Sequence, residues 1–220
     1  MKLLKTLRSY LPRPRYTLTA ALPAGEWCLR NINLSSLLPR GPEPPCLDYL
    51  HIMTYDFSGP WTQLSGHQAQ LHAPPDPPNA FAKRSMTAIT QYLVHQQKVD
   101  PSRLVMGVPV YGRSFLGVDG PGKAFSGHAG DVNGIFEYRD LPRPGTEEVV
   151  DECCGAAWCY GEDGGWVSYD TPAVVRQKGR FVKERGLGGL FFWTGSSDAK
   201  EEDRSLIVAG HRVLNGEQQC

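Results

Sequence analysis

The stretch Met53-Thr54-Tyr55-Asp56-Phe57 closes an apolar run that begins at Tyr49, and Gly59-Pro60-Trp61 follows it. Such a run predicts a buried β-strand that ends in a phenol and a carboxylate, beside a glycine turn and an indole. The phenol and the carboxylate can contact hydroxyl and amide groups, and the indole offers a flat stacking face. The combination indicates a sugar site, although a strand that ends in an ordinary polar turn also accounts for this element alone.

Two further apolar runs end in the same way. Leu104-Val105-Met106-Gly107-Val108-Pro109-Val110 leads into Tyr111-Gly112-Arg113, and Gly188-Gly189-Leu190-Phe191-Phe192 leads into Trp193. Near-continuous apolar strands are typical of parallel sheets. No glycine-rich phosphate loop of an open doubly wound sheet follows these strands. Side chains that meet from the carboxyl ends of successive strands instead indicate the active site of a β/α barrel.

Helical patterns alternate with these strands, which predicts a parallel α/β fold. A β-rich run over residues 16–21 predicts the first strand, and the stretch Gly41-Pro42-Glu43-Pro44-Pro45 predicts a loop. Amphipathic spacing predicts helices at the start of the chain, from Met86 to Val94, over 171–185 and over 205–214, with a short helical patch at Leu34, Leu37 and Leu38.

The segment 114–166 interrupts this alternation. It contains many glycines and short β-like pieces, such as Phe136-Glu137-Tyr138 and Trp166-Val167-Ser168-Tyr169, but no long amphipathic pattern. Its aromatic residues argue against a disordered loop. We therefore expect an α+β insertion at 114–166, within a partial barrel formed by residues 1–113 and 167–220.

Composition excludes several classes of partner. Lys and Arg total 23, as do Asp and Glu, so the net charge is zero and no attraction to nucleic acid is expected. No apolar run approaches the length that spans a bilayer, so no membrane partner is expected. The start, Met1 to Arg8, predicts an amphipathic helix end rather than the apolar core of a signal peptide.

The cysteines have no spacing that suits a metal site, and no cofactor is expected. A disulfide from Cys159 to Cys153 or Cys154 and fully reduced thiols are both compatible with the sequence. The other cysteines, Cys28, Cys46 and Cys220, are dispersed along the chain.

The three strand-end motifs, in this order, resemble those of chitinases of glycoside hydrolase family 18. The resemblance rests on Met53–Phe57, Tyr111-Gly112-Arg113-Ser114-Phe115 and Phe192-Trp193. It implies a (β/α)8 TIM barrel with a small α+β insertion after the seventh strand, where residues 114–166 fall. Flanking stretches resemble the fungal type: Leu47-Asp48-Tyr49-Leu50, Ser65-Gly66-His67, Ser168-Tyr169-Asp170-Thr171 and Ser196-Ser197-Asp198.

The resemblance also implies roles for the candidate site residues. These enzymes use the N-acetyl oxygen of the substrate as the nucleophile, in place of a carboxylate. Tyr55 would donate a hydrogen bond to the acetamido carbonyl group, and Asp56 would line the cleavage subsite. The residues implied to bind the sugar are Tyr111 and Arg113 by direct contact, Met53 by packing nearby, Trp193 beneath the distorted sugar and Trp61 on the leaving-group side. Alternatively, Arg113 forms only a structural ion pair and Trp193 belongs to the core.

The general acid of the family is missing from this sequence. In the family the fourth strand carries Asp-x-x-Asp-x-Asp-x-Glu, and no such string occurs in these 220 residues. The opening helix resembles the one after that strand, so we expect roughly the last four βα units of the barrel. Glu26 follows the first predicted strand, at the rim of the barrel that carries the candidate site, but we expect it to be a solvated loop charge. We expect Glu137 and Asp140 to be surface or groove residues.

Three hypotheses follow for the function. The chain is a fragment of an endo-type chitinase, an inactive chitin-binding module similar to the chitinase-like lectins, or a non-functional remnant. Loss of a whole strand, rather than substitution of one Glu, favours the fragment. The expected ligand is chitin or a chito-oligosaccharide. Two open barrel edges would also favour self-association, and the resemblance implies an extracellular or cell-wall location.

Overall fold

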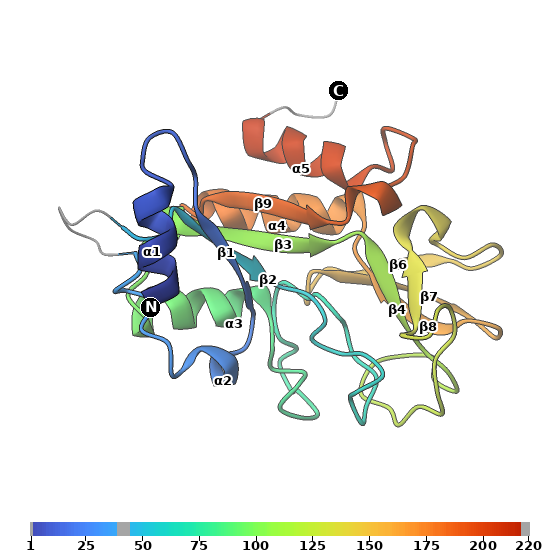
Figure 1. Ribbon diagram of the computed structural model, residues 1–220. Coiled ribbons are helices and arrows are strands. Elements are labelled where there is room, and N and C mark those ends of the chain that lie inside the picture. Colours follow the sequence, from blue (N-terminus) through green and yellow to red (C-terminus); the bar gives the residue numbers. More distant parts are fainter. Residues whose placement is uncertain (1, 39–44, 217–220) are drawn as a thin grey trace.

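Two β-sheets with helices packed around them make up the structure, a computed structural model that describes residues 2–38 and 45–216 (Figure 1). The first sheet is parallel, with the strand order β1-β2-β3-β9, and the second is antiparallel, with the order β5-β4-β8-β7-β6. Most of the predicted loop at 41–45 and the terminal Cys220 lie outside the described residues.

Three strands of the parallel sheet are those that the apolar runs predict, and the first, predicted over residues 16–21, lies over residues 19–23 instead. The strands of this sheet are β1 (Thr19–Pro23), β2 (Tyr49–Met53), β3 (Leu104–Pro109) and β9 (Gly189–Trp193). Every pair is parallel, with β1 and β9 at the two edges of the sheet. The prediction of a parallel α/β arrangement is therefore confirmed for these strands.

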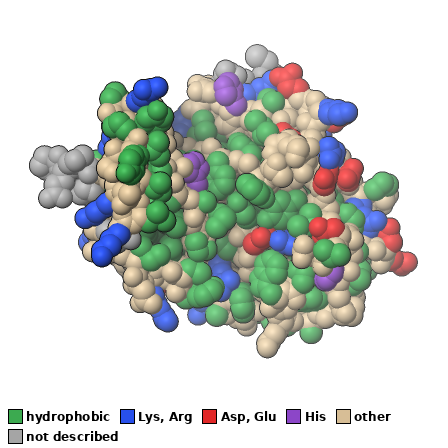
Figure 2. Space-filling view, viewed as in Figure 1, with side chains coloured by type: hydrophobic (Ala, Val, Ile, Leu, Met, Phe, Trp, Pro, Cys, Tyr) green, Lys and Arg blue, Asp and Glu red, His purple; other side chains and the backbone are tan. Residues whose placement is uncertain are grey.

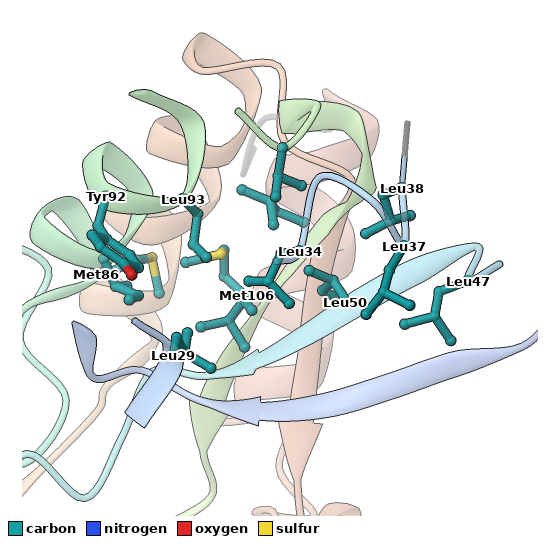
Figure 3. Packing of buried hydrophobic residues seen from close by; sticks show 14 of the residues in the cluster. Leu29, Leu34, Leu37, Leu38, Leu47, Leu50, Met86, Tyr92, Leu93 and Met106 are labelled. Carbon is teal, nitrogen blue, oxygen red and sulfur yellow. The ribbon is translucent and has the colours of Figure 1, made fainter. Parts of the chain in front are cut away.

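One face of this sheet packs against helices. Leu50 and Ile52 from β2 and Leu104 and Met106 from β3 are fully buried and belong to one hydrophobic cluster. Figure 3 shows Leu50 and Met106 within one group of side chains that also includes Leu93 from the helical layer. The period-2 alternation of a strand explains why these residues share one face.

The opposite face of the parallel sheet is more open. Tyr49, Ala21 and Trp193 are exposed, and the ring of His51 contacts that of Phe191 edge-on at 5.2 Å. Figure 2 shows hydrophobic side chains gathered over the parallel sheet in this view. The sheet thus has one covered face and one face that is only partly covered.

The helices begin near the residues that the sequence predicts. Hydroxyl groups of Ser85, Thr171 and Ser205 cap α3, α4 and α5, because each accepts a hydrogen bond from an amide in the first turn. Helices α4 and α5 pack against each other.

In the described part of the chain, no helix is long and apolar enough to cross a membrane. The helices are α1 (Lys2–Tyr10), α2 (Glu26–Leu29), α3 (Met86–Gln91), α4 (Pro172–Glu184) and α5 (Leu206–Asn215), with the π-helical η1 (Tyr92–Gln96) and the 3₁₀ turns η2 (Pro101–Arg103), η3 (Tyr138–Asp140) and η4 (Gly195–Ser197).

The antiparallel sheet lies between β3 and α4 in the chain. It extends beyond the segment 114–166, because its β4 begins at residue 111 and its β8 ends at residue 169. Tyr111 and Arg113 therefore belong to the antiparallel sheet rather than to the end of a barrel strand. Its strands are β4 (Tyr111–Phe115), β5 (Ile135–Glu137), β6 (Glu148–Asp151), β7 (Ala156–Gly161) and β8 (Gly165–Tyr169).

The local structure differs from the predictions in two further places. The patch at Leu34, Leu37 and Leu38 forms turns instead of a helix, although all three leucines are buried. The side-chain oxygen of Asn33 accepts a hydrogen bond from the Ser36 amide, which offers the backbone an alternative to a helix. The short helix α2 has no counterpart in the predicted elements.

The cysteines in the described part of the chain are free thiols. The structure thus corresponds to the alternative with reduced thiols rather than to the one with a disulfide. Cys153 is exposed, whereas Cys154 and Cys159 are buried. Burial and the nearby Asp151 carboxylate raise the pKa of the Cys154 thiol to about 12.

Candidate active site

The carboxyl ends of the parallel strands all lie at one end of the sheet. Pro23 of β1 pairs with Met53 of β2, and Pro109 of β3 pairs with Trp193 of β9. Residues just after these positions therefore emerge side by side, as expected for a site at the carboxyl ends of parallel strands.

Asp56 lies near the middle of this carboxyl end of the sheet, just after the inner strand β2. Its backbone has a φ of 59°, in the left-handed region that few residues other than glycine adopt. Its Oδ1 atom accepts hydrogen bonds from the Tyr111 hydroxyl at 2.8 Å and from Arg113 Nε at 2.9 Å. The second oxygen, Oδ2, has no hydrogen bond to any described residue. Asp56 thus joins the parallel sheet to β4 through one oxygen only.

Arg113 is a buried cation with several partners. Its Nη2 atom lies 2.9 Å from Asp56 Oδ1, and its Nη1 atom donates a hydrogen bond to the carbonyl of Asn133 at 2.7 Å. The guanidinium carbon lies 4.8 Å from the centre of the Trp61 ring and 5.4 Å from that of Tyr111. Arg113 therefore forms the ion pair that the alternative predicts, and its partner Asp56 is itself a candidate site residue.

Tyr55 stands next to this group of residues. Its ring meets those of Tyr111 and Phe191 edge-on, each at 6.2 Å between centroids. Burial and the neighbouring Asp56 carboxylate raise the pKa of Tyr55 to about 12. The same two causes also raise the pKa of Tyr111, whose hydroxyl donates to that carboxylate. Both phenols are therefore hydrogen-bond donors at neutral pH.

Buried hydrogen bonds fix the backbone of these residues. Thr54 Oγ1 donates to the Gly107 carbonyl at 2.7 Å, which ties the end of β2 to β3. Gln68 Nε2 donates to the Tyr111 carbonyl at 2.7 Å, and the Gln68 carbonyl accepts from the Phe57 amide at 2.9 Å. Because all of these groups are paired, the two tyrosines are held on rigid elements.

A groove of about 400 Å³ opens beside these residues. It has aromatic and apolar walls with a carboxylate and a guanidinium, the composition expected of a ligand site. The groove is lined by Pro23, Ala24, Gly25, Trp27, Cys28, Met53, Tyr55, Asp56, Phe57, Trp61, Phe81 and Arg84.

Trp193 does not line the groove, but it lies at the same carboxyl end of the sheet. Its side chain is 59% exposed, so the alternative that it belongs to the core is wrong. It ends the edge strand β9, two residues after Phe191, and alternation therefore places both on the open face of the sheet. Phe191 in turn contacts Tyr55.

The other carboxylates considered from the sequence lie outside the groove. Glu26 is exposed in the first turn of α2 and is not part of the groove lining. Glu137 forms an exposed ion pair with Arg139, and Asp140 is exposed. Among the described residues, no cluster of His, Cys, Asp and Glu could hold a metal ion.

Three of the large aromatic or charged side chains that line the groove had no role in the sequence prediction: Trp27, Phe81 and Arg84. Trp27 follows β1 in Gly25-Glu26-Trp27 just as Trp61 follows β2 in Gly59-Pro60-Trp61. That repeated spacing was a usable signal for Trp27. Phe81 and Arg84 come from a long loop, and no pattern in the sequence marks them.

Sequence comparisons match this chain to known proteins. A family model described as "Glycosyl hydrolases family 18" matches residues 1–198. Endochitinase 1 of Metarhizium robertsii is 36% identical, covering 91% of this chain and 46% of that protein. Chitinase 1 of Aphanocladium album is 33% identical, covering 94% of this chain and 48% of that protein. The chain thus spans about half the length of the curated relatives it matches.

Solved structures resemble the whole chain. Catalytic domain 2 of the Ostrinia furnacalis group II chitinase has a TM-score of 0.82 and 26% identity, covering 100% of this chain and 60% of that one. A chitinase of the same family from Cycas revoluta, crystallised with (GlcNAc)3, has a TM-score of 0.73 and 26% identity, covering 98% of this chain and 62% of that one.

Proposed function

This chain belongs to glycosyl hydrolase family 18, and on that premise we propose that its groove binds β-1,4-linked N-acetylglucosamine chains as part of a chitinase-type site. The observation that carries the proposal is the linkage of Asp56 to Tyr111 and Arg113, with Tyr55 beside them and exposed indoles around them. Phenol donors, a carboxylate and flat apolar rings match a sugar that carries an acetamido group. The solved Cycas revoluta relative, which holds (GlcNAc)3, supports the same ligand class.

In the reaction that we propose for the whole site, the acetamido oxygen of the substrate attacks the anomeric carbon while the glycosidic bond breaks. The leaving oxygen takes a proton from a general acid, and water then opens the cyclic intermediate with net retention. Tyr55 donates a hydrogen bond to the acetamido group, and the free Oδ2 of Asp56 faces it. Met53, Trp61, Tyr111, Arg113 and Trp193 hold the sugar.

We propose that the proton donor for this reaction lies outside these 220 residues, which contain no Asp-x-x-Asp-x-Asp-x-Glu string. We place the parallel sheet as the fifth to eighth strands of an eight-stranded barrel. The edges of β1 and β9 would then pair with the remaining strands, or with a second copy when those strands are absent. Without the acid, hydrolysis falls by about 10²–10⁴-fold.

A second candidate function is a binding module without turnover. One observation favours it: the proposed sugar contacts Tyr55, Tyr111 and Trp193 are present, while the acid motif is absent from the sequence. The two candidates share one groove and differ only in the proton donor.

Chitin beads and a fluorogenic N-acetylglucosamine oligomer test both candidates. We expect the purified chain to be retained on the beads, Tyr55→Phe and Trp193→Ala to weaken retention, and turnover by the chain alone to stay near background. Failure of the wild-type chain to bind chitin would refute the proposal, and turnover at chitinase rates would exclude the binding module. Codons for the acid motif, in frame upstream of Met1 in the native transcript, would support the chitinase.

A further inference from the structure

Two Gly-x-Trp stretches, one at the start of α2 and one in a turn, each place a tryptophan over a glycine. Gly25-Glu26-Trp27 follows β1, and Gly59-Pro60-Trp61 follows the neighbouring β2. A Cβ atom on Gly25 would lie 2.9 Å from Trp27 Nε1, and one on Gly59 would lie 2.5 Å from Trp61 Cη2. Each indole therefore rests directly on the backbone of its own glycine, which fixes its position although the ring faces solvent.

Both indoles are exposed and both line the groove described above. Trp27 is 64% exposed and Trp61 is 50% exposed. The groove between them also contains Tyr55 and Asp56. An exposed tryptophan that is held in place beside a sugar site presents a stacking face at little cost in conformational entropy.

Arg84 supplies a polar group beside Trp27. Its guanidinium lies 4.4 Å from the centre of the Phe81 ring, which supports it from one side. No described residue forms a hydrogen bond or an ion pair with that guanidinium. Burial lowers the pKa of Arg84, but an arginine remains charged at neutral pH. Arg84 and Trp27 line both this groove and an adjoining hollow of about 440 Å³, so the cavity continues past them.

We infer that Trp27 and Arg84 form an additional sugar position, which takes a further N-acetylglucosamine unit of the chain bound at Tyr55 and Asp56. The indole stacks on the apolar face of the pyranose ring, and the guanidinium donates hydrogen bonds to its hydroxyl or acetamido oxygens. The inference rests on the proposed function, because it assigns the length of chain that the same groove accepts.

Calorimetric titration with the N-acetylglucosamine dimer and pentamer tests this inference. We expect Trp27→Ala to weaken pentamer binding about tenfold, the loss of one stacked ring, and dimer binding less than about twofold. Gly25→Ala should act in the same direction, because Gly25 has a φ of −134° that alanine tolerates, and its Cβ displaces the indole. Arg84→Met keeps the apolar stem over Phe81, and should also weaken the pentamer selectively.

Tyr160→Ala is the matched control, because Tyr160 is an exposed aromatic residue on β7 outside the groove. It should leave both affinities unchanged. If both Trp27→Ala and Gly25→Ala bound the pentamer as tightly as the wild type, this inference would be overturned while the proposed function stood. An equal loss of affinity for the dimer and the pentamer would have the same meaning. A wild-type chain that binds neither oligomer would overturn the inference together with the proposed function.

Discussion

Arg113 holds Asp56 through two nitrogen atoms, Nε and Nη2, which both lie 2.9 Å from the same carboxylate oxygen. The Tyr111 hydroxyl bonds to this oxygen as well. Concentrating three donors on Oδ1 fixes the orientation of the carboxylate and leaves Oδ2 without a partner among the described residues. It also connects the two sheets, because Asp56 follows β2 and Arg113 lies on β4.

Replacing Arg113 by Met should therefore destabilise the fold and weaken binding together. The arginine is almost fully buried, whereas the Asp56 side chain is 36% exposed, so solvent screens part of the loss. We expect a cost of about 1–3 kcal/mol, below the 3–5 kcal/mol typical of a fully buried pair. Urea unfolding of the variant measures this cost.

The double variant Asp56→Asn with Arg113→Met is the control for that measurement. It removes both charges, so it should recover part of the stability that Arg113→Met loses. Equal stability of Arg113→Met and the wild type would show that the ion pair contributes nothing to the fold.

The positions of the site residues along the strands could be predicted from sequence, but their mutual contacts could not. Apolar runs end at Met53 and Trp193, and alternation with helices places such ends at one edge of a parallel sheet. The hydrogen bond between Arg113 and Asp56 joins residues 57 positions apart. It depends on the left-handed turn at Asp56, which no local pattern specifies.

The helices show the same division between local and long-range information. Capping hydroxyls at Thr171 and Ser205 mark helix starts in the sequence itself. The leucines at 34, 37 and 38 have helical spacing, yet the Ser36 amide donates a hydrogen bond to the Asn33 side chain, which favours turns. All three leucines are buried in the cluster under the sheet, which accounts for their apolar character.

Tyr55 should remain protonated well into the alkaline range. Its pKa is raised to about 12 from the ordinary value of 10.0. Between these values the unfolded chain releases this proton and the folded chain keeps it, so its contribution to stability is complete below pH 10 and is lost towards pH 12. The difference in absorbance at 295 nm between wild type and Tyr55→Phe follows this titration. A midpoint near pH 10 would contradict the burial of the phenol beside Asp56.

Gly107→Ala should disturb Tyr55 from the neighbouring strand. A Cβ at this position would lie 2.7 Å from Tyr55 Cε1, 2.8 Å from Phe191 Cζ and 3.0 Å from the Ile52 carbonyl oxygen. The strand backbone cannot yield easily, so we expect a loss of about 1–3 kcal/mol in the free energy of unfolding. The loss of oligomer affinity should exceed that of Gly120→Ala, a control position with nothing within 4 Å of the added Cβ. Equal unfolding midpoints for the two variants would argue against this packing.

Lys178 and Asp170 form a buried ion pair of 2.5 Å between the end of β8 and helix α4. Burial raises the pKa of Asp170 and lowers that of Lys178. Their mutual attraction opposes both shifts, and for Asp170 the nearby His67 does so as well. Lys178→Met leaves a buried carboxylate without its cation and should cost about 3–5 kcal/mol. The double variant Lys178→Met with Asp170→Leu removes both charges and should recover most of that loss. Urea unfolding of both variants measures these effects. A double variant less stable than Lys178→Met would contradict this prediction, because the lost stability would then not come from the unpaired charge.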